Sequence, residues 1–231
     1  MTLNIANHRN ILFQILKDIY SDTTIAPYLG FKGGTAALLF YDLNRFSVDL
    51  DFDLLDQSKE GEIFDKVTKI VKQYGVIKDA RKKRFTLFFL LSYALGEHTI
   101  KIEINRRKSS SFYEVKNYLG VSMSVMKQAD MFANKLLAMR ERIGRANRDI
   151  YDVYFFSKNN WPINTDLVEQ RSGMIFKTIL LESITALEKI DNRHILDGMG
   201  ELLTPSQKDW VKAKLISDTI TFLKLRLENE N

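Results

Sequence analysis

Residues 31–54 read FKGGTAALLFYDLNRFSVDLDFDL and combine a glycine pair, a short apolar run and a row of carboxylates. Residues 46–54 alternate between apolar and polar, so in an extended strand Asp49, Asp51 and Asp53 share one face. Carboxylates about 7 Å apart along a strand repel one another unless a cation lies among them. Hard oxygen ligands of this kind suit Mg²⁺ or Mn²⁺. We therefore expect a metal-binding strand that uses Asp49 and Asp51.

The glycine pair comes directly before the apolar run AALLFY. Gly33, Gly34 and Thr35 predict a tight turn into a helix N-terminus, whose unpaired N–H groups can bind a phosphate. One helix and one loop fit between Gly34 and Asp49, which returns the turn to the start of the carboxylate strand. A triphosphate could then contact both features, although a glycine pair alone can also be an ordinary turn.

Composition limits the remaining choices. The chain has 231 residues, 45% of them hydrophobic, and no cysteine, so we expect a globular protein without disulfides or thiolate metal sites. Because it has no apolar run of membrane-spanning length and no signal-peptide pattern, we expect a cytoplasmic protein with no membrane partner. His8, His98 and His194 lack metal-ligand spacing. The net charge is +5, and residues 1–163 carry 25 basic and 18 acidic residues, so a phosphate-bearing partner should meet this part.

The order of predicted elements indicates an α/β fold of the α+β type. Helical periodicity predicts helices at residues 5–20 and 59–74, and alternation predicts strands at 76–81, 85–93 and 99–105. From residue 124 the pattern is helical, with helices at 125–143 and 148–157, another from about Asn164, and a break at 197–205. We expect an α/β domain at 1–120, with a small mixed sheet flanked by helices, and a helical domain at 121–231 that closes the active-site cleft.

Glu103 is the predicted third carboxylate. It alternates with isoleucines in TIKIEIN, so pairing of this strand beside residues 47–53 would bring Glu103 to Asp49 and Asp51 as a metal ligand. The alternative is a solvated strand face whose acids pair with Lys101 or Arg106.

Four motifs in order resemble the AbiEii/AbiGii toxin family, a branch of the polymerase-beta-like nucleotidyltransferases. They are K-G-G-T at 32–35, R-x-S-x-D-x-D at 45–51, Lys135 in NKLLAMRER, and RDIYDVYFF at 148–156. The resemblance implies a polymerase-beta-like nucleotidyltransferase domain that uses a nucleoside triphosphate (NTP) and a divalent metal. It implies transfer of a nucleoside monophosphate to an acceptor hydroxyl, with release of pyrophosphate. The 3′ end of tRNA is the acceptor in characterised relatives, which act as toxins with cognate antitoxins or in abortive infection of phage-infected cells.

The resemblance also implies roles for individual residues. The predicted substrate-binding set is Lys32, Gly33, Gly34, Thr35, Arg45 and Ser47. The predicted catalytic set is Asp49, Asp51, Lys135, Asp149 and Asp152, with Asp49 and Asp51 as metal ligands. Glu103 joins the predicted metal ligands only through the alternation of TIKIEIN. Lys135 would neutralise the triphosphate. Asp149 and Asp152 share a helical face and could orient Lys135, act as a base, or serve as a cap or an ion-pair partner of Arg145 or Arg148. This branch of the superfamily does not require a third carboxylate such as Glu103.

Two other functions remain open on the sequence. One is a nucleotidyltransferase that modifies a protein or a small molecule, by AMP transfer or as an antibiotic-modifying enzyme. The other is a catalytically silent nucleotide-binding module. The basic runs at 81–84 and 106–108 could follow an RNA backbone or could be solvated loops.

Overall fold

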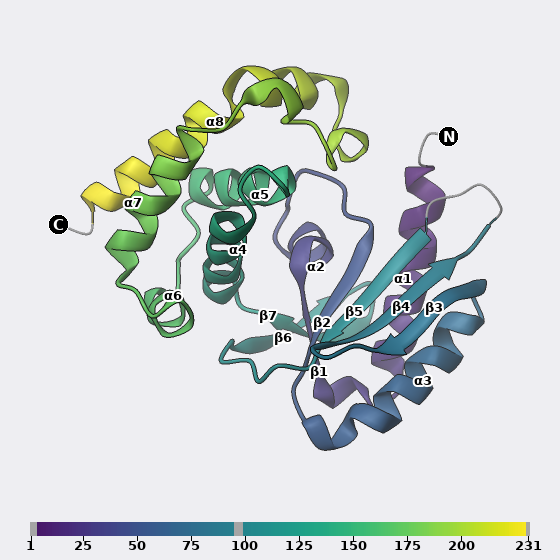
Figure 1. The fold of residues 1–231 in the computed structure, drawn as a ribbon. Coiled ribbons are helices and arrows are strands. Elements are labelled where there is room, and N and C mark those ends of the chain that lie inside the picture. The colour runs from purple at the N-terminus through teal and green to yellow at the C-terminus, as the bar shows by residue number, and fades with distance from the viewer. Residues whose placement is uncertain (1–3, 95–98, 230–231) are drawn as a thin grey trace. The chain divides into compact units, whose positions relative to one another are not determined.

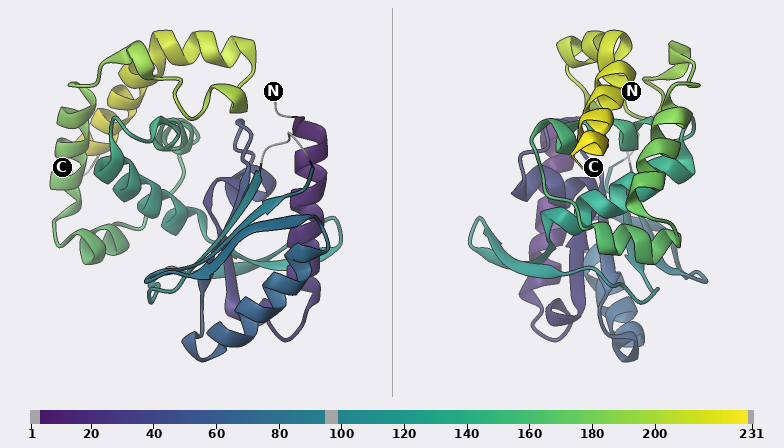
Figure 2. Two further views of the ribbon diagram at one scale, coloured as in Figure 1. Left: turned by 45° about the vertical axis from the view of Figure 1, so that its right-hand side comes forward. Right: turned by 90° about the vertical axis from the view of Figure 1, so that its left-hand side faces the viewer.

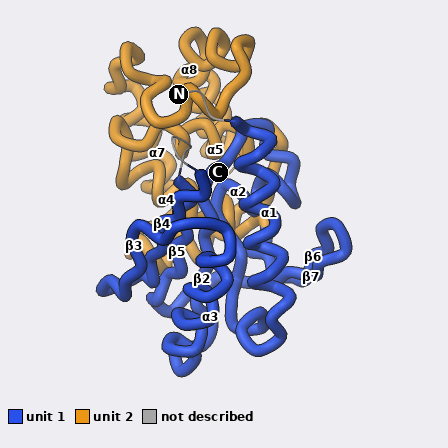
Figure 3. Tube along the Cα trace, turned by 90° about the vertical axis from the view of Figure 1, so that its right-hand side faces the viewer, with its two compact units in different colours: residues 1–127 blue, residues 128–231 orange. Residues whose placement is uncertain are grey.

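The computed structural model describes residues 4–94 and 99–229, so His98 lies outside the described residues. The chain forms two compact units, residues 1–127 and 128–231 (Figure 3). The sequence predicts the boundary between the α/β domain and the helical domain at residue 120. In the structure the boundary between the two units lies seven residues later, after the last hairpin of the sheet. None of the described helices is both long and apolar enough to cross a membrane.

The first unit is a mixed sheet with helices (Figure 1). Its α-helices are α1 (Ile5–Ser21), α2 (Gly33–Phe40) and α3 (Glu60–Lys72). Its strands are β1 (Leu29–Lys32), β2 (Asp49–Leu54), β3 (Val76–Lys82), β4 (Thr86–Ser92), β5 (Thr99–Asn105), β6 (Tyr113–Tyr118) and β7 (Val121–Met126). The 3₁₀ turns Ala26–Tyr28 and Gln57–Lys59 precede β1 and α3.

In the sheet formed by the described residues, the carboxylate strand β2 is the central one of seven strands. The strand order is β3-β4-β5-β2-β1-β7-β6. β2 pairs antiparallel with β1 and parallel with β5, and β1 pairs parallel with β7. The β3–β4, β4–β5 and β6–β7 pairs are antiparallel. This order gives β2 a hydrogen-bonded neighbour on each side, so its side-chain directions are firmly set.

The two faces of the sheet differ in character. Leu50 and Phe52 of β2 and the isoleucines of β5 are fully buried. Helices α1 and α3 cover this apolar face, as the two views of Figure 2 show. The alternate residues of β2, β5 and β4 form the opposite face, which we call the open face; it carries Asp49, Asp51 and Glu103. Burial of the apolar face thereby fixes which side presents the carboxylates.

The described part of the second unit is helical. Its α-helices are α4 (Gln128–Arg142), α5 (Asn147–Lys158), α6 (Thr165–Ser172), α7 (Phe176–Leu187) and α8 (Pro205–Glu228), with 3₁₀ turns at Asn192–His194 and Gly200–Leu202. Asn164 caps α6, because its side chain accepts a hydrogen bond from the Leu167 N–H. The stacked rings of Phe156 and Trp161, with centroids 3.9 Å apart, anchor the end of α5 in the unit core.

The mixed α/β class and the strands predicted within 76–105 are confirmed. The prediction that a helix begins at residue 125 is wrong, because VSMSVM has period two and pairs with β6, and α4 begins only at Gln128. β2 begins at Asp49, so Phe46 and Ser47 belong to the loop before it. The sequence pattern does not predict strands β1, β6 and β7. For β1 the reason is its length, because four residues are too few to show an alternation.

Candidate active site

The turn between β1 and α2 brings the glycine pair against the carboxylate strand. Gly33 begins α2 at a φ of +78°, a conformation that favours glycine. A Cβ at Gly33 would collide with the Asp51 carboxylate, and one at Gly34 would come within 2.9 Å of the Arg45 guanidinium. The side chain of the N-cap residue Lys32 makes no capping hydrogen bond to the helix. The first turn of α2 therefore offers backbone N–H groups beside Asp51.

Hydrogen bonds connect the loop before β2 and the start of β2 to helix α2. The Thr35 hydroxyl donates to the Asp49 carbonyl at 2.5 Å and lies 3.0 Å from the Ser47 Oγ. Arg45 is almost fully buried, and its Nη1 donates to the Phe46 carbonyl at 2.9 Å. Thr35, Arg45 and Ser47, all predicted to bind substrate, thus make contacts that hold the turn and the strand together.

The register of β2 and β5 brings the three predicted carboxylates together. Asp51 lies directly opposite Glu103, and Asp49 lies opposite Lys101. The Lys101 ammonium contacts Glu103 at 3.0 Å and Asp49 at 3.4 Å. Burial lowers the pKa of Lys101, but the charges of Asp49 and Glu103 outweigh burial and raise it overall. An ammonium group therefore lies between two of the acids, which is the alternative pairing with Lys101 that the sequence left open.

Burial and neighbouring charges both act on the carboxyl of Asp51. Asp51 is only partly exposed to solvent. Burial and the neighbouring charge of Asp49 raise the pKa of Asp51, Glu103 adds to this effect, and Lys101 and Lys32 oppose it. The raised pKa means that the folded protein disfavours the ionised form of Asp51. A bound cation would offset this free-energy cost.

Asp53, the last acid of the row, is buried, and its carboxylate accepts hydrogen bonds from three other side chains. It accepts from Lys32 Nζ at 2.5 Å, from Asn105 Nδ2 at 2.7 Å and from the Tyr113 hydroxyl at 2.5 Å. Burial and then the Asp53 charge raise the pKa of Tyr113. Asp53 is therefore a structural anchor, and Lys32, predicted to bind substrate, forms an ion pair with it.

A divalent cation fits Asp49 and Asp51 better than it fits all three acids. Among residues 4–94 and 99–229, no three histidine, aspartate or glutamate side chains group as a metal site. Mg²⁺ commonly uses one or two carboxylates and completes its shell with water and substrate phosphates. Asp49 and Asp51, beside the helix N-terminus at Gly33, match that pattern. Glu103, next to Lys101, is the least suited of the three predicted ligands.

The remaining predicted residues form an ion cluster inside the helical unit. Lys135 of α4 contacts Asp149 at 2.9 Å and Asp152 at 2.8 Å, both on α5 and both fully buried. Arg142 Nη2 lies 2.7 Å from Asp149 Oδ2, although the pair lacks hydrogen-bond alignment. The two acids hold the lysine, as one of the predicted alternatives stated, and Asp149 pairs with Arg142 rather than with Arg145 or Arg148.

Sequence reasoning missed the role of three residues. Asn105 alternates with Glu103, so the period of TIKIEIN is the available signal for placing Asn105 on its face. No local pattern marks Tyr113 or Arg142, because each meets its aspartate through tertiary contacts.

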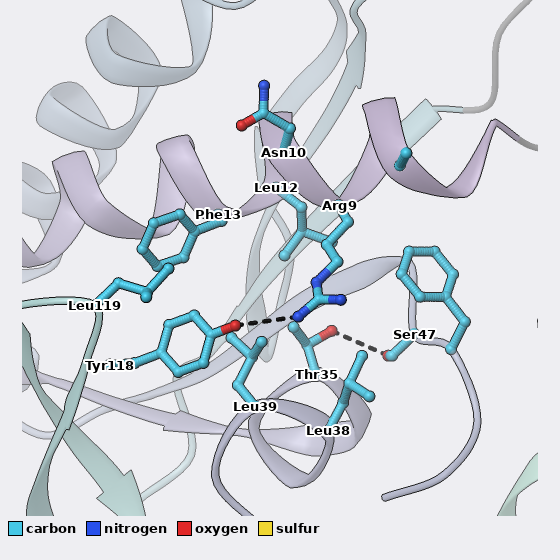
Figure 4. Close-up of a pocket in the computed structure, with 12 residues that line it drawn as sticks. Arg9, Asn10, Leu12, Phe13, Thr35, Leu38, Leu39, Ser47, Tyr118 and Leu119 are labelled. Carbon is cyan, nitrogen blue, oxygen red and sulfur yellow. Dashed lines mark hydrogen bonds between the residues drawn. The ribbon is translucent and has the colours of Figure 1, made fainter. Parts of the chain in front are cut away.

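A cavity of about 350 Å³ lies behind the turn (Figure 4). Residues of α1, α2, the loop before β2 and the β6–β7 turn line it, and most are apolar. Thr35 and Ser47 lie in its wall, and Arg9 donates to the Tyr118 hydroxyl at 3.2 Å. The cavity therefore shares with the site only the two hydroxyls that fasten the loop.

We expect Gly33→Ala to lower the stability of the protein. An alanine at this φ costs about 1–2 kcal/mol, and its Cβ also displaces the Asp51 carboxylate. Thermal unfolding should show a melting temperature lower by roughly 2–8 °C. Gly61→Ala is the matched control, because a Cβ there meets open space in α3. Equal melting temperatures for the two variants would contradict the crowding at Gly33.

Comparisons with known proteins identify the family and the fold of the chain. The family profile described as "Nucleotidyl transferase AbiEii toxin, Type IV TA system" matches residues 14–214. JHP933 from Helicobacter pylori has a similar structure, with a TM-score of 0.64 and 21% identity, covering 100% of this chain and 96% of that one. A second H. pylori structure, described as a candidate nucleotidyltransferase, gives a TM-score of 0.64 and 22% identity, covering 100% of this chain and 99% of that one. No curated protein sequence matches. These two structures establish the fold, and the profile match establishes that the chain belongs to the AbiEii nucleotidyl transferase toxin family of type IV toxin–antitoxin systems.

Proposed function

We propose that the protein transfers a nucleoside monophosphate from an NTP to an acceptor hydroxyl, with the 3′ end of an RNA, such as tRNA, as the acceptor. The observation that carries this proposal is the contact between Gly33 and the Asp51 carboxylate. It joins a phosphate-binding helix N-terminus to a carboxylate pair within one unit.

In this reaction the acceptor oxygen attacks the α-phosphorus, and the bond to pyrophosphate breaks. The hydroxyl proton leaves to solvent. The N–H groups of Gly34 and its neighbours would bind triphosphate oxygens, while Asp49 and Asp51 would hold Mg²⁺ or Mn²⁺. When bound, such a cation activates the hydroxyl and stabilises the leaving group.

For the helical unit we propose that Lys135 meets a substrate phosphate as a compact positive charge. Asp149 and Asp152 then act as positioning residues, because both are buried and bind the lysine ammonium. Their contacts favour this role over that of a base toward the acceptor.

A labelling assay tests the reaction. The full-length protein is incubated with each of four α-³²P-labelled NTPs, Mg²⁺, and either total RNA or protein extract. We expect label in RNA, lost in the Asp49→Ala variant. Label only in protein or in a small molecule would assign a different acceptor. Absence of turnover, with no effect of Mg²⁺ on nucleotide affinity, would indicate a silent binding module.

We further propose that the protein acts as the toxin of a pair with a cognate antitoxin, as its family implies. Induced expression in a bacterial host should arrest growth, and Asp49→Ala should relieve the arrest. Equal arrest by the variant at equal protein level would separate toxicity from nucleotide transfer.

A further inference from the structure

The two ends of β2 adjoin different chemical groups. At its start, the Thr35 hydroxyl binds the Asp49 carbonyl and Gly33 contacts Asp51. At its other end, Asp53 lies opposite Asn105 of β5. Since parallel strands β2 and β5 end together, the residues after Asn105 lie at the end of β2 remote from the glycine turn.

The two basic runs meet at that remote end. Asn105 lies opposite Thr86 of β4, and the Arg106 N–H donates to the Phe85 carbonyl at 2.8 Å. The run before β4 and the run after β5 are therefore adjacent, although about twenty residues separate them in the chain. We call Lys83, Arg84, Phe85, Arg107 and Lys108 the basic corner.

The corner combines uncompensated cations with accessible aromatic surface. Arg81 pairs with Asp79, and Lys82 and Arg106 with Glu60. Within the described residues, the four cations of the basic corner have no carboxylate partner. Phe85 is 40% exposed, with the guanidinium carbons of Arg84 and Arg107 at 4.8 and 4.1 Å from its ring centroid.

A second aromatic links the corner to the carboxylates across the open face. Phe88 lies opposite Glu103, which lies opposite Asp51, so the three side chains form one row on the open face. Strands are about 4.8 Å apart, which puts Phe88 about 10 Å from Asp51. Lys83 Nζ lies 3.3 Å from the Phe88 ring centroid. Positive charges over stacking rings are the features by which proteins bind unpaired nucleic acid.

We propose that the basic corner binds the unpaired end of a nucleic-acid strand, with phosphates on its arginines and lysines and a base on Phe85 or Phe88. Such a strand would bring its terminal hydroxyl to Asp49 and Asp51 from the side opposite the glycine turn. This direction rests on the proposed function, since in-line displacement needs the attacking and leaving oxygens on opposite sides of the phosphorus.

The test measures binding of a fluorescent, unstructured oligoribonucleotide of about 12 nucleotides by anisotropy at several salt concentrations. The corner variant is Arg84→Gln/Arg107→Gln. The matched control is Lys69→Gln/Lys72→Gln, which removes two exposed charges from α3. We expect the corner variant to lose about tenfold or more in affinity, and its slope of log K against log salt to become shallower by about 1.4. The control should bind like the wild type. Phe85→Leu should also weaken binding, by about fivefold or more, through lost stacking.

Two further measurements separate the corner from the reaction. Thermal stability and the melting shift caused by Mg²⁺ and NTP should be the same in the corner variant and the wild type. If the wild type labels RNA and the corner variant labels it equally well, the corner proposal is overturned while the proposed function stands. If the oligonucleotide binds through the corner but no NTP is turned over, the proposed function fails and the corner stands. Equal oligonucleotide binding by the corner and control variants also overturns the corner proposal.

Discussion

Asp51→Asn should abolish nucleotide transfer, by about a thousandfold or more, and yet make the metal-free protein more stable. The substituted amide would keep the shape of the side chain but remove a charge whose ionisation is opposed by burial and by Asp49. Relief of that cost should raise the melting temperature, by roughly 2–4 °C for each kcal/mol gained. Stability gained where activity is lost is expected of a charged active site.

The pH dependence of this gain has a definite sign. Because the pKa of Asp51 is raised in the folded state, the cost of its ionisation is fully present above the folded pKa and disappears as the pH falls through it. The stability difference between Asp51→Asn and the wild type should therefore be largest at alkaline pH and shrink toward acid. Mg²⁺ should stabilise the wild type at alkaline pH and leave the variant unchanged. A difference that grows toward acid would contradict the assignment of the raised pKa.

Lys135→Met should destabilise the protein more than either Gly33→Ala or any substitution in the basic corner. Removing one partner of a buried ion pair typically costs about 3–5 kcal/mol, because the remaining charge stays buried. Lys135 contacts both Asp149 and Asp152, whose side chains are almost inaccessible to solvent. We expect the melting temperature to fall by roughly 6–20 °C.

A compensating substitution distinguishes charge from packing. Lys135→Met/Asp152→Asn removes one of the two buried carboxylates that lost the lysine contact, so part of the lost stability should return. Lys214→Met, at an exposed position of α8, serves as the control and should change the melting temperature little. If the double variant is no more stable than Lys135→Met, the loss arises from packing around the lysine stem instead.

The ion cluster also connects α4 and α5. Lys135 donates to Asp149 Oδ1 and Arg142 lies 2.7 Å from Asp149 Oδ2, so α4 supplies two cations to one buried acid of α5. This arrangement joins the two helices and fixes the direction of the lysine ammonium. Where Lys135 binds a substrate phosphate, as we propose, holding the ammonium in place lowers the entropic cost of that binding.

The sequence by itself determined the features that depend on local order. The period of residues 49–54 and 99–105 placed the acids on one face and the core on the other, because side chains alternate along any strand. Gly33 and Gly34 before an apolar run identified the helix N-terminus, and four motifs in order identified the family. Each of these signals is carried by neighbouring residues.

Only the tertiary structure decided how the acids are divided among tasks. Asp53 is occupied by Lys32, Asn105 and Tyr113, Glu103 is paired with Lys101, and Asp51 lies against Gly33. The physical reason is that these contacts depend on strand register and on segments far apart in the chain. No periodicity within one segment specifies which distant partner will neutralise a given charge.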